Sequence, residues 1–100
     1  MALEYELILS PSADCCRILC RRMGLDEGCF QNENWAGALL VQGKVAQIIA
    51  AADVSTKSAN VAAREVWGNC PQHITTIALV GDIAEVKQAL KALQEKGMVG

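Results

Sequence analysis

Apolar and polar side chains alternate at the start of the chain, a pattern typical of a β-strand that buries one face better than the other. One face of the predicted strand carries Leu3, Tyr5, Leu7 and Leu9, and the other carries Glu4, Glu6 and Ile8. The alternation stops at Ser10. We therefore expect a strand over residues 3–9.

A helix is predicted directly after this strand. Ser10 followed by Pro11 is typical of an N-cap and the first position of a helix. Side chains with apolar character then recur three and four residues apart, at Cys16, Leu19, Cys20 and Met23. Gly24 ends this pattern, so the helix is expected to be short and amphipathic.

The middle of the chain predicts a loop, a buried strand and a longer helix. Residues 25–34 are mostly polar and contain glycine, as expected of a connection. The run 36–41 is continuously apolar, which is typical of a strand covered on both faces, and Gln42 with Gly43 is expected to turn the chain. A helical stripe then indicates a helix that continues to about Asn60, with Val45, Ile48, Ile49 and Ala52 on its apolar face.

Two strands and a last helix follow. Residues 61–67 and 73–80 have the composition of strands and lie on either side of the sequence GNCPQ. Asp82 and Glu85 form a D-x-x-E pattern, which predicts a capping box at the start of a helix. The apolar positions of that helix are Val86, Ala89, Leu90 and Leu93, and Gly97 is expected to end it.

The predicted order is strand, helix, strand, helix, strand, strand, helix. A β-α-β-β-α unit usually continues to a fourth strand that completes an antiparallel sheet, and here no strand is predicted after the last helix. The amino-terminal strand is expected to take that place. The fold class is therefore α+β, with a four-stranded antiparallel sheet and helices.

Composition narrows the possible functions. The 100 residues are 52% hydrophobic and 20% charged, as expected of one globular domain. The formal net charge of −2 comes from interspersed acids and bases, without the basic stripe that binds nucleic acid or a membrane surface. The amino terminus carries acids where a secretory signal carries bases, and no apolar run reaches the ~20 residues needed to span a bilayer. We expect a cytosolic protein that binds neither nucleic acid nor a membrane.

Five cysteines at irregular spacing argue against a disulfide framework in a cytosolic protein. Cys16 and Cys20 share the helical stripe and are expected to be core residues. Cys15 lies off the stripe, and Cys29 lies in the predicted loop. Because the chain has no C-x-x-C pair, a self-contained zinc or ferredoxin-type site is not expected.

Two segments together resemble the signature of a known family. AADVSTKSANV, from Ala51 to Val61, is followed two strands later by VGDIAEVKQAL, from Val80 to Leu90. Their sequences and spacing resemble the BMC domain of bacterial microcompartment shell proteins, over residues 36–96. A strand and helix come first here, whereas they come last in ordinary BMC domains, and this order is similar to that of circularly permuted shell proteins.

The resemblance implies a ferredoxin-like permuted BMC fold in a single domain, residues 1–100. The permuted strand and helix would occupy residues 1–24, the loop residues 25–34 and the BMC core residues 35–100. It also implies a structural role in the shell of a compartment in the bacterial cytoplasm, and no enzymatic activity.

The GNCPQ stretch has a counterpart in this family. Permuted shell proteins of glycyl-radical microcompartments carry a G-x-C-P-Q motif implicated in iron–sulfur binding, and this chain matches it at Gly68, Cys70, Pro71 and Gln72. The resemblance implies that these four residues bind the cofactor, that Cys70 ligates the metal, and that they form a pore loop together with Asn69. Gly68 would permit a tight turn or a close approach, and Pro71 would bias Cys70 toward an extended conformation.

Assembly would supply the missing ligands. The family forms cyclic hexamers that tile edge to edge, and Lys57 occupies the position of a lysine at the tile edge. One thiol per chain cannot hold a cluster, but a ring of Cys70 thiolates could supply the four cysteines that a [4Fe-4S] centre usually takes. Other shell proteins and encapsulated enzymes are the further expected partners.

Several alternatives remain open from the residues alone. The cluster would serve electron transfer across the shell or delivery of iron–sulfur units, or the loop would shape a plain metabolite pore without a cluster. An enzyme with Cys70 as redox nucleophile would have His73 as its base. His73 is otherwise a fourth ligand, a pore donor or a solvated strand residue, and a small ligand-sensing regulatory domain would share the fold class.

Overall fold

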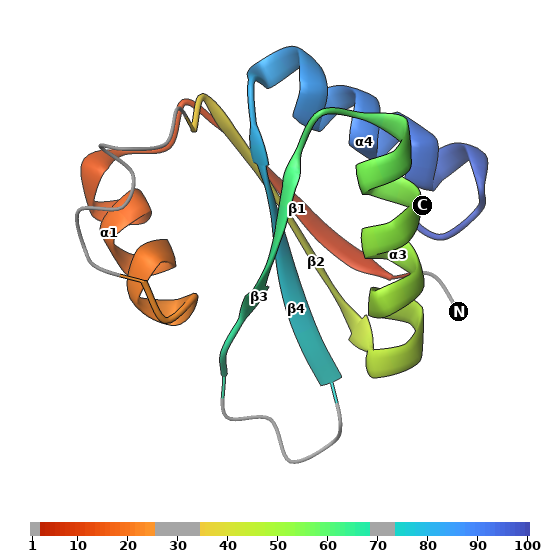
Figure 1. Ribbon diagram of the computed structural model, residues 1–100, viewed down its shortest axis with the longest axis horizontal. Coiled ribbons are helices and arrows are strands. Elements are labelled where there is room, and N and C mark those ends of the chain that lie inside the picture. The colour runs from red at the N-terminus through yellow and green to blue at the C-terminus, as the bar shows by residue number, and fades with distance from the viewer. Residues whose placement is uncertain (1–2, 26–34, 69–73) are drawn as a thin grey trace.

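The computed structural model describes residues 3–25, 35–68 and 74–100. Its centre is a four-stranded antiparallel sheet in the order β1-β2-β4-β3, with α3 and α4 on one face and α1 on the other (Figure 1). The elements are β1 (Glu4–Leu9), α1 (Ala13–Arg22), β2 (Gly37–Lys44), α3 (Val45–Ser58), β3 (Ala62–Val66), β4 (Ile74–Gly81) and α4 (Ile83–Glu95). The α+β class and the antiparallel sheet are as predicted.

The amino-terminal strand completes the sheet, as expected from the element order. β1 pairs antiparallel with β2 along its whole length, from Glu4 opposite Gln42 to Leu9 opposite Gly37. The two ends of the chain also meet at this edge. The main-chain N–H of Leu3 donates to the carbonyl of Met98 at 2.8 Å, and Leu3 forms a parallel bridge with Val99.

The sheet separates two hydrophobic cores, because successive side chains of a strand point to opposite faces. The core on the α3 and α4 side contains Leu3, Leu39, Val41, Ile48, Ala51, Ile77, Leu79, Ala89, Leu93 and Val99. The core on the α1 side contains Cys16, Leu19, Cys20, Met23, Trp35, Ala38, Ala78 and Val80. The prediction that the strand after the loop is covered on both faces is therefore confirmed.

Small residues on the sheet decide where α1 packs. Ala38 and Ala78 are fully buried beneath this helix, and their short side chains leave room for it to approach. Further along the same strands, four residues after Ala38 and two before Ala78, stand Gln42 and Thr76, whose side chains are joined by a hydrogen bond of 3.1 Å. The polar character of this half of the face suits a surface that α1 does not cover.

The start of α1 differs from the prediction. The N-cap is Ser12, whose hydroxyl oxygen accepts a hydrogen bond from the N–H of Cys15 at 3.1 Å, and not Ser10. Ser10 instead turns the chain out of β1 with a φ of 51°. Since Ser10 and Ser12 both suit an N-cap and flank Pro11, the pattern alone does not distinguish them. Gly24 follows the helix at a φ of 72°, as expected of its end.

The predicted turn at Gln42 and Gly43 is wrong. β2 continues through both residues to Lys44, and α3 begins at the next residue. A Cβ at position 43 would overlap the side chain of Leu3. Gly43 is therefore needed for close packing inside the sheet and not for a change of chain direction.

The buried face of α3 also differs from the predicted stripe. Ile48, Ala51 and Ser55 are its buried residues, whereas Val45 is 46% and Ile49 is 66% exposed. Both residues are apolar and fall at helical spacing, so the sequence pattern assigned them to the buried face, whereas the structure exposes them. None of the helices in the described ranges has the length and apolar character to cross a membrane.

The capping box at α4 is not formed. Asp82 is the N-cap residue, as predicted, but its side chain makes no capping hydrogen bond. The carboxylate of Glu85 accepts a hydrogen bond from the N–H of Asn60 instead of reaching back to Asp82. The other predicted features of α4 are present: Val86, Ala89 and Leu93 are buried, and Gly97 follows the helix at a φ of 71°.

Candidate functional site

The GNCPQ motif lies in the connection between two neighbouring strands. β3 and β4 pair antiparallel, and the pair nearest this connection is Val66 opposite Thr76. Residues 67–73 therefore join adjacent strand ends, as the sequence predicted. The candidate residues Asn69, Cys70, Pro71, Gln72 and His73 lie outside the described residues.

The chain that enters the motif is attached to α1. The N–H of Trp67 donates to the carbonyl of Arg22 at 2.7 Å, and Nη1 of Arg22 donates to the carbonyl of Trp67 at 3.4 Å. These two hydrogen bonds join residues 45 positions apart in the sequence. The end of α1 thus holds the chain immediately before the motif, a role that the sequence analysis did not assign to Arg22.

Gly68 does not have the surroundings that the sequence analysis expected. A Cβ built at this residue would meet nothing within 4 Å, and Gly68 is not among the glycines with positive φ. Neither a close approach nor a left-handed backbone explains the glycine within the described part of one chain.

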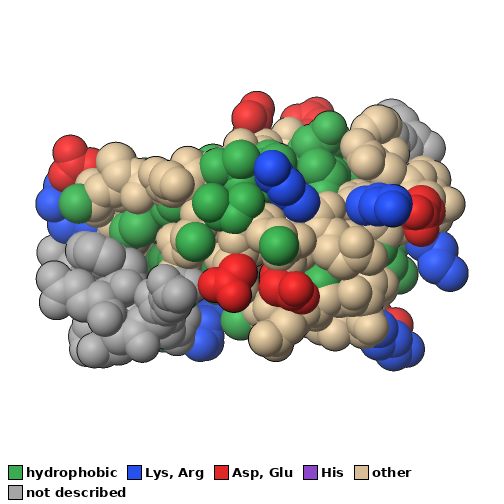
Figure 2. All heavy atoms as spheres, turned by 90° about the horizontal axis from the view of Figure 1, so that it is seen from above, with side chains coloured by type: hydrophobic (Ala, Val, Ile, Leu, Met, Phe, Trp, Pro, Cys, Tyr) green, Lys and Arg blue, Asp and Glu red, His purple; other side chains and the backbone are tan. Residues whose placement is uncertain are grey.

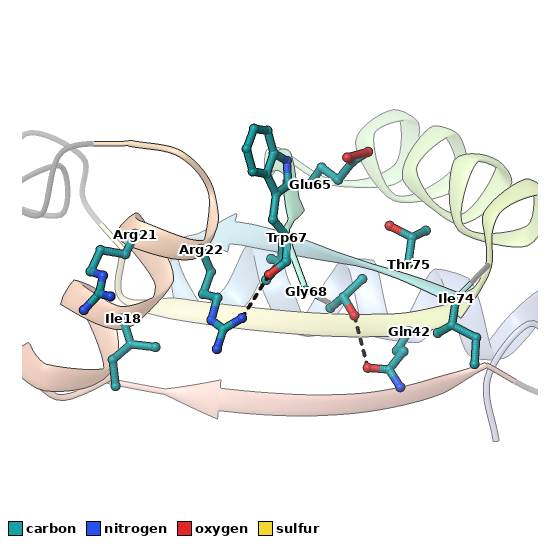
Figure 3. Close-up of a pocket in the computed structure, with 11 residues that line it drawn as sticks. Ile18, Arg21, Arg22, Gln42, Glu65, Trp67, Gly68, Ile74 and Thr75 are labelled. Atoms are coloured by element: carbon teal, nitrogen blue, oxygen red, sulfur yellow. Dashed lines mark hydrogen bonds between the residues drawn. The ribbon is translucent and has the colours of Figure 1, made fainter. Parts of the chain in front are cut away.

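A pocket of about 970 Å³ opens beside this strand connection. It lies between the last two turns of α1 and the polar end of the sheet (Figure 3). Arg21 and Arg22 line it from α1, while Gln42 and Thr76 line it from the sheet. Trp67 stands at the rim with 66% of its surface exposed. Nothing in the hydrophobic pattern pointed to this pocket, because its residues come from four separate segments.

The burial of the α1 cysteines is largely as predicted. Cys16 is 5% exposed and Cys20 is fully buried in the α1 core, whereas Cys15 is half-buried. Burial, with the neighbouring Cys15 thiol as a second cause, raises the pKa of Cys16 above its ordinary value. Cys20 is disulfide-bonded, so it is not the unmodified thiol that the sequence analysis expected. Cys29 lies outside the described residues.

Lys57 lies in the last turn of α3 with 74% of its side chain exposed. Its Nζ is 2.9 Å from Oδ2 of Asp53, one turn earlier on the same helix. Exposed pairs of this kind contribute only about 0.3–0.5 kcal/mol, so the ammonium group is not held firmly.

Comparison with known proteins decides the family. The sequence matches the BMC domain over residues 37–100, well over half of the chain. The chain belongs to the BMC domain family. β1 and α1 precede the matched region; β1 pairs with the first strand of that region, and α1 packs on the sheet that they form together.

Two solved shell proteins resemble this BMC chain over nearly their whole lengths. The ligand-free GrpU microcompartment shell protein from Pectobacterium wasabiae is 30% identical, with a TM-score of 0.67, and the alignment covers 91% of this chain and 99% of that one. Ligand-free GrpU from Clostridiales bacterium 1_7_47FAA is 26% identical, with a TM-score of 0.68 and coverage of 94% and 90%. The protein is thus a microcompartment shell subunit, and its family is structural rather than catalytic.

A third solved structure bears on the fold alone. The fused permuted hexameric shell protein of the RMM microcompartment is 18% identical, with a TM-score of 0.58. The alignment covers 97% of this chain and 46% of that protein. The BMC chain therefore corresponds to about half of the fused protein and shares its permuted fold. No curated protein matched the chain.

Proposed function

We propose that this shell subunit forms hexameric tiles in which Cys70 binds an iron–sulfur cluster near the central pore. The placement of the G-x-C-P-Q motif supports the proposal: it occupies a single connection between neighbouring strands, one copy per chain. A cyclic assembly would bring several copies of such a connection around one axis. The motif also suggests a compartment of the glycyl-radical type.

Exposed apolar surface supports the assembly part of this proposal. Tyr5, Leu9, Val45 and Ile49 are large apolar residues with 36–66% of their surface exposed. Figure 2 shows apolar side chains gathered over the middle of one end of the molecule, with charged groups around them. Tyr5 and Leu9 lie on β1 and Val45 and Ile49 lie on α3, so two elements expose apolar surface, and exposed apolar patches commonly mark interfaces between proteins. Other shell proteins would meet the tile edge at Lys57, and encapsulated enzymes would meet one of its faces.

The cluster part rests on ligand number and charge. A [4Fe-4S] centre usually takes four cysteine thiolates, which one Cys70 per chain cannot supply and several chains can. Within the described ranges, no group of three or more histidine, cysteine or acidic side chains lies together. Arg21 and Arg22 line the pocket beside the strand connection, and their positive charge would suit a thiolate-ligated, anionic centre.

Each residue near the connection has a distinct task in this proposal. Cys70 would be the ligand, and Pro71 would limit the conformations in which the thiolate is presented. Arg22 would hold the preceding residue, Trp67, through the two hydrogen bonds described above. When bound, an iron–sulfur cluster supplies one-electron chemistry, which suits electron transfer across the shell; delivery of clusters to an enclosed enzyme would use the same ligand.

Reconstitution with iron and sulfide under anaerobic conditions tests the proposal. We expect the wild-type chain to become brown and to contain iron and sulfide in a fixed ratio, and Cys70→Ser to stay colourless but hexameric in light scattering. A serine oxygen is a poorer ligand than a thiolate for these clusters. Cys15→Ser is the matched control, because Cys15 is a half-buried cysteine on α1, and it should reconstitute like wild type.

Two results would overturn parts of the proposal separately. If Cys70→Ser binds iron and sulfide in wild-type amounts, the cluster assignment is wrong and a tile with a plain metabolite pore is the better interpretation. If the wild-type chain is a monomer in dilute buffer, the tile itself is wrong.

A further inference from the structure

The outer edge of β1 is unpaired over most of its length and carries different chemistry on its two sides. We infer that this edge binds an extended peptide of alternating apolar and basic residues, which is added to the sheet as a further strand. The inference goes beyond the proposed function and divides the apolar surface named there. The part on β1 is assigned to a partner peptide, and the part on α3 is left to contacts between subunits.

The hydrogen bonds at the two ends of β1 show which backbone groups point out of the sheet. The N–H of Ser10 donates to the carbonyl of Ala36, which directly precedes β2, so this N–H points toward β2. The N–H of Leu3 points the other way and donates to the carbonyl of Met98. Because backbone groups alternate in direction along a strand, the even-numbered residues of β1 face β2 and the odd-numbered ones face outward.

Three residues of β1 therefore present unpaired backbone groups at the edge of the sheet. They are Tyr5, Leu7 and Leu9, and no described residue forms a backbone hydrogen bond with their outward N–H and carbonyl groups. An open strand edge of this kind can accept another strand through main-chain hydrogen bonds. The chain already uses the edge in this way at Leu3, where Val99 forms a parallel bridge.

One side of this edge is apolar. Leu7 packs against the core beneath α3 and α4, so Tyr5 and Leu9, two residues away in each direction, start from the same face. Tyr5 is 36% and Leu9 is 41% exposed. Apolar side chains on an added strand would lie opposite both residues, and pairs of aromatic and β-branched residues across strands stabilise a sheet.

The other side of the edge is acidic. Ile8 packs against the α1 core, so Glu4 and Glu6 start from that face of the sheet. Both residues are exposed, and neither carboxylate forms an ion pair within the described residues. Lys44 is a diagonal neighbour of Glu4 on β2 and balances at most one of the two charges. Basic side chains on the added strand would supply the missing opposite charges.

The same two acids disfavour a second copy of β1 as the added strand. In an antiparallel pairing of two copies centred on Leu7, Glu6 of one copy would be a diagonal neighbour of Glu6 of the other. With Glu4 from each copy, four carboxylates would then gather on one face of the two strands, where like charges oppose pairing. Charge complementarity thus favours a basic peptide over self-association.

A short synthetic peptide tests the inference. The peptide KVKVKVK, labelled with fluorescein, has the required alternation, and its binding to the assembled protein is measured by fluorescence anisotropy. We expect saturable binding of this peptide, and none of EVEVEVE, in which the charge is reversed. KKVVVKK has the composition of KVKVKVK without the alternation and should bind at least about tenfold more weakly.

Methylated peptides test the main-chain hydrogen bonds. In an antiparallel pairing with the valines opposite the outward-facing residues of β1, the valine N–H groups point toward β1 and the lysine N–H groups point away. A methyl group on the central valine nitrogen should therefore weaken binding about tenfold or more. The same methyl group on a neighbouring lysine nitrogen should leave the affinity unchanged.

Variants of the protein test the acidic side. The double variant Glu4→Lys with Glu6→Lys should bind KVKVKVK at least about tenfold more weakly and should gain affinity for EVEVEVE, because two attractive pairs become repulsive and the reverse. Glu65→Lys is the matched control, since Glu65 is an exposed acid on β3, the outer strand at the other side of the sheet. It should bind KVKVKVK like wild type.

Tyr5 reports the position of the peptide directly. The chain contains one tyrosine, so incorporation of fluorotyrosine labels Tyr5 alone. In fluorine NMR, the Tyr5 signal should shift saturably with KVKVKVK and stay unchanged with EVEVEVE. Tyr5→Thr removes the ring but keeps a residue that suits a strand; it should weaken binding and leave the size of the assembly in light scattering unchanged.

Any of four results would overturn the inference. The first is the absence of a saturable Tyr5 shift with KVKVKVK. The second is equal affinity for the two methylated peptides, because the peptide would then not be added as a strand. The third is an equal loss of affinity in the double variant and in Glu65→Lys, since general charge would then attract the peptide. The fourth is a smaller assembly in Tyr5→Thr, which would show that β1 lies between subunits.

Discussion

The side-chain carboxylate of Glu85 accepts a hydrogen bond of 2.6 Å from the main-chain N–H of Asn60. Glu85 lies in the first turn of α4, and Asn60 lies between the end of α3 and the start of β3. One carboxylate thus ties the start of the last helix to a connection 25 residues earlier in the chain. It also places a negative charge at the positive end of the α4 dipole.

Removal of this carboxylate should destabilise the protein. We expect Glu85→Ala to lower the free energy of unfolding by about 1 kcal/mol, the usual contribution of one such hydrogen bond. Glu85→Gln keeps an acceptor oxygen and should recover part of the loss. Denaturant unfolding measures both variants. Glu95→Ala, at the other end of α4, should change stability by less than about 0.5 kcal/mol, and an equal effect of Glu85→Ala and Glu95→Ala would contradict the assignment.

Gly37 is required by packing. A Cβ at this position would lie 2.6 Å from Cγ2 of Val86, and Val86 is fully buried, so its side chain has little room to move. We expect Gly37→Ala to cost about 1–3 kcal/mol, as is usual for overpacked cores. Gly68→Ala should change stability by less than about 0.5 kcal/mol, because a Cβ there meets nothing within 4 Å. Thermal and denaturant unfolding distinguish the two, and similar losses would refute the packing argument.

Lys57 tests the tile edge separately from the hexamer. Lys57→Asp should leave hexamers in light scattering but prevent larger sheets in electron microscopy, because it reverses the charge at the proposed tile edge. It also places a carboxylate one turn from Asp53 on the same helix. Asp53→Asn is the control: it removes the partner of Lys57 and keeps the ammonium group, so sheets should still form. Normal sheets from Lys57→Asp would show that this lysine has no part in assembly.

The raised pKa of Cys16 predicts a loss of stability in alkaline solution. Burial disfavours the thiolate in the folded chain, whereas the unfolded thiol ionises near its ordinary value of 9.0. The unfolded state therefore releases its proton first, and the free energy of unfolding should fall as the pH rises above about 9. Denaturant unfolding between about pH 8 and pH 10 measures the slope.

Cys16→Ala should flatten that slope, at a loss of about 1 kcal/mol at neutral pH for the smaller core side chain. The half-buried Cys15 should react with thiol reagents faster than Cys16. An unchanged slope in Cys16→Ala would mean that another group causes the alkaline loss.

Much of the sheet was predictable because alternation and apolar runs report burial directly. The strand at residues 4–9, the two-faced strand that contains Leu39 and the pair that flanks the motif all follow from local pattern. The exposure of Ile49 was not predictable, since an apolar residue at helical spacing satisfies a core pattern whether or not another element covers it. Family membership, which the comparisons confirm, came from the spacing of two motifs and not from periodicity.

The contacts around the candidate site could not be predicted from the sequence, for a different reason. The hydrogen bonds between Arg22 and Trp67 join segments 45 residues apart, and the pairing of Glu85 with Asn60 spans 25 residues. Local propensity contains no information about such partners. In the D-x-x-E pattern, Glu85 was expected to bond the nearby N–H of Asp82, but it bonds the distant N–H of Asn60 instead. Tertiary structure here overrides a local preference.

The meeting of Leu3 with Met98 and Val99 has a consequence for how this fold is encoded. Where residues near the two ends of a domain touch, a short peptide can join those ends and the chain can be opened at another exposed connection without loss of a strand pair. Tandem copies can equally be spliced end to end through the same point. For such a domain, the gene can begin at more than one place, and the order of the elements along the polypeptide is free to change while their neighbours in space stay the same.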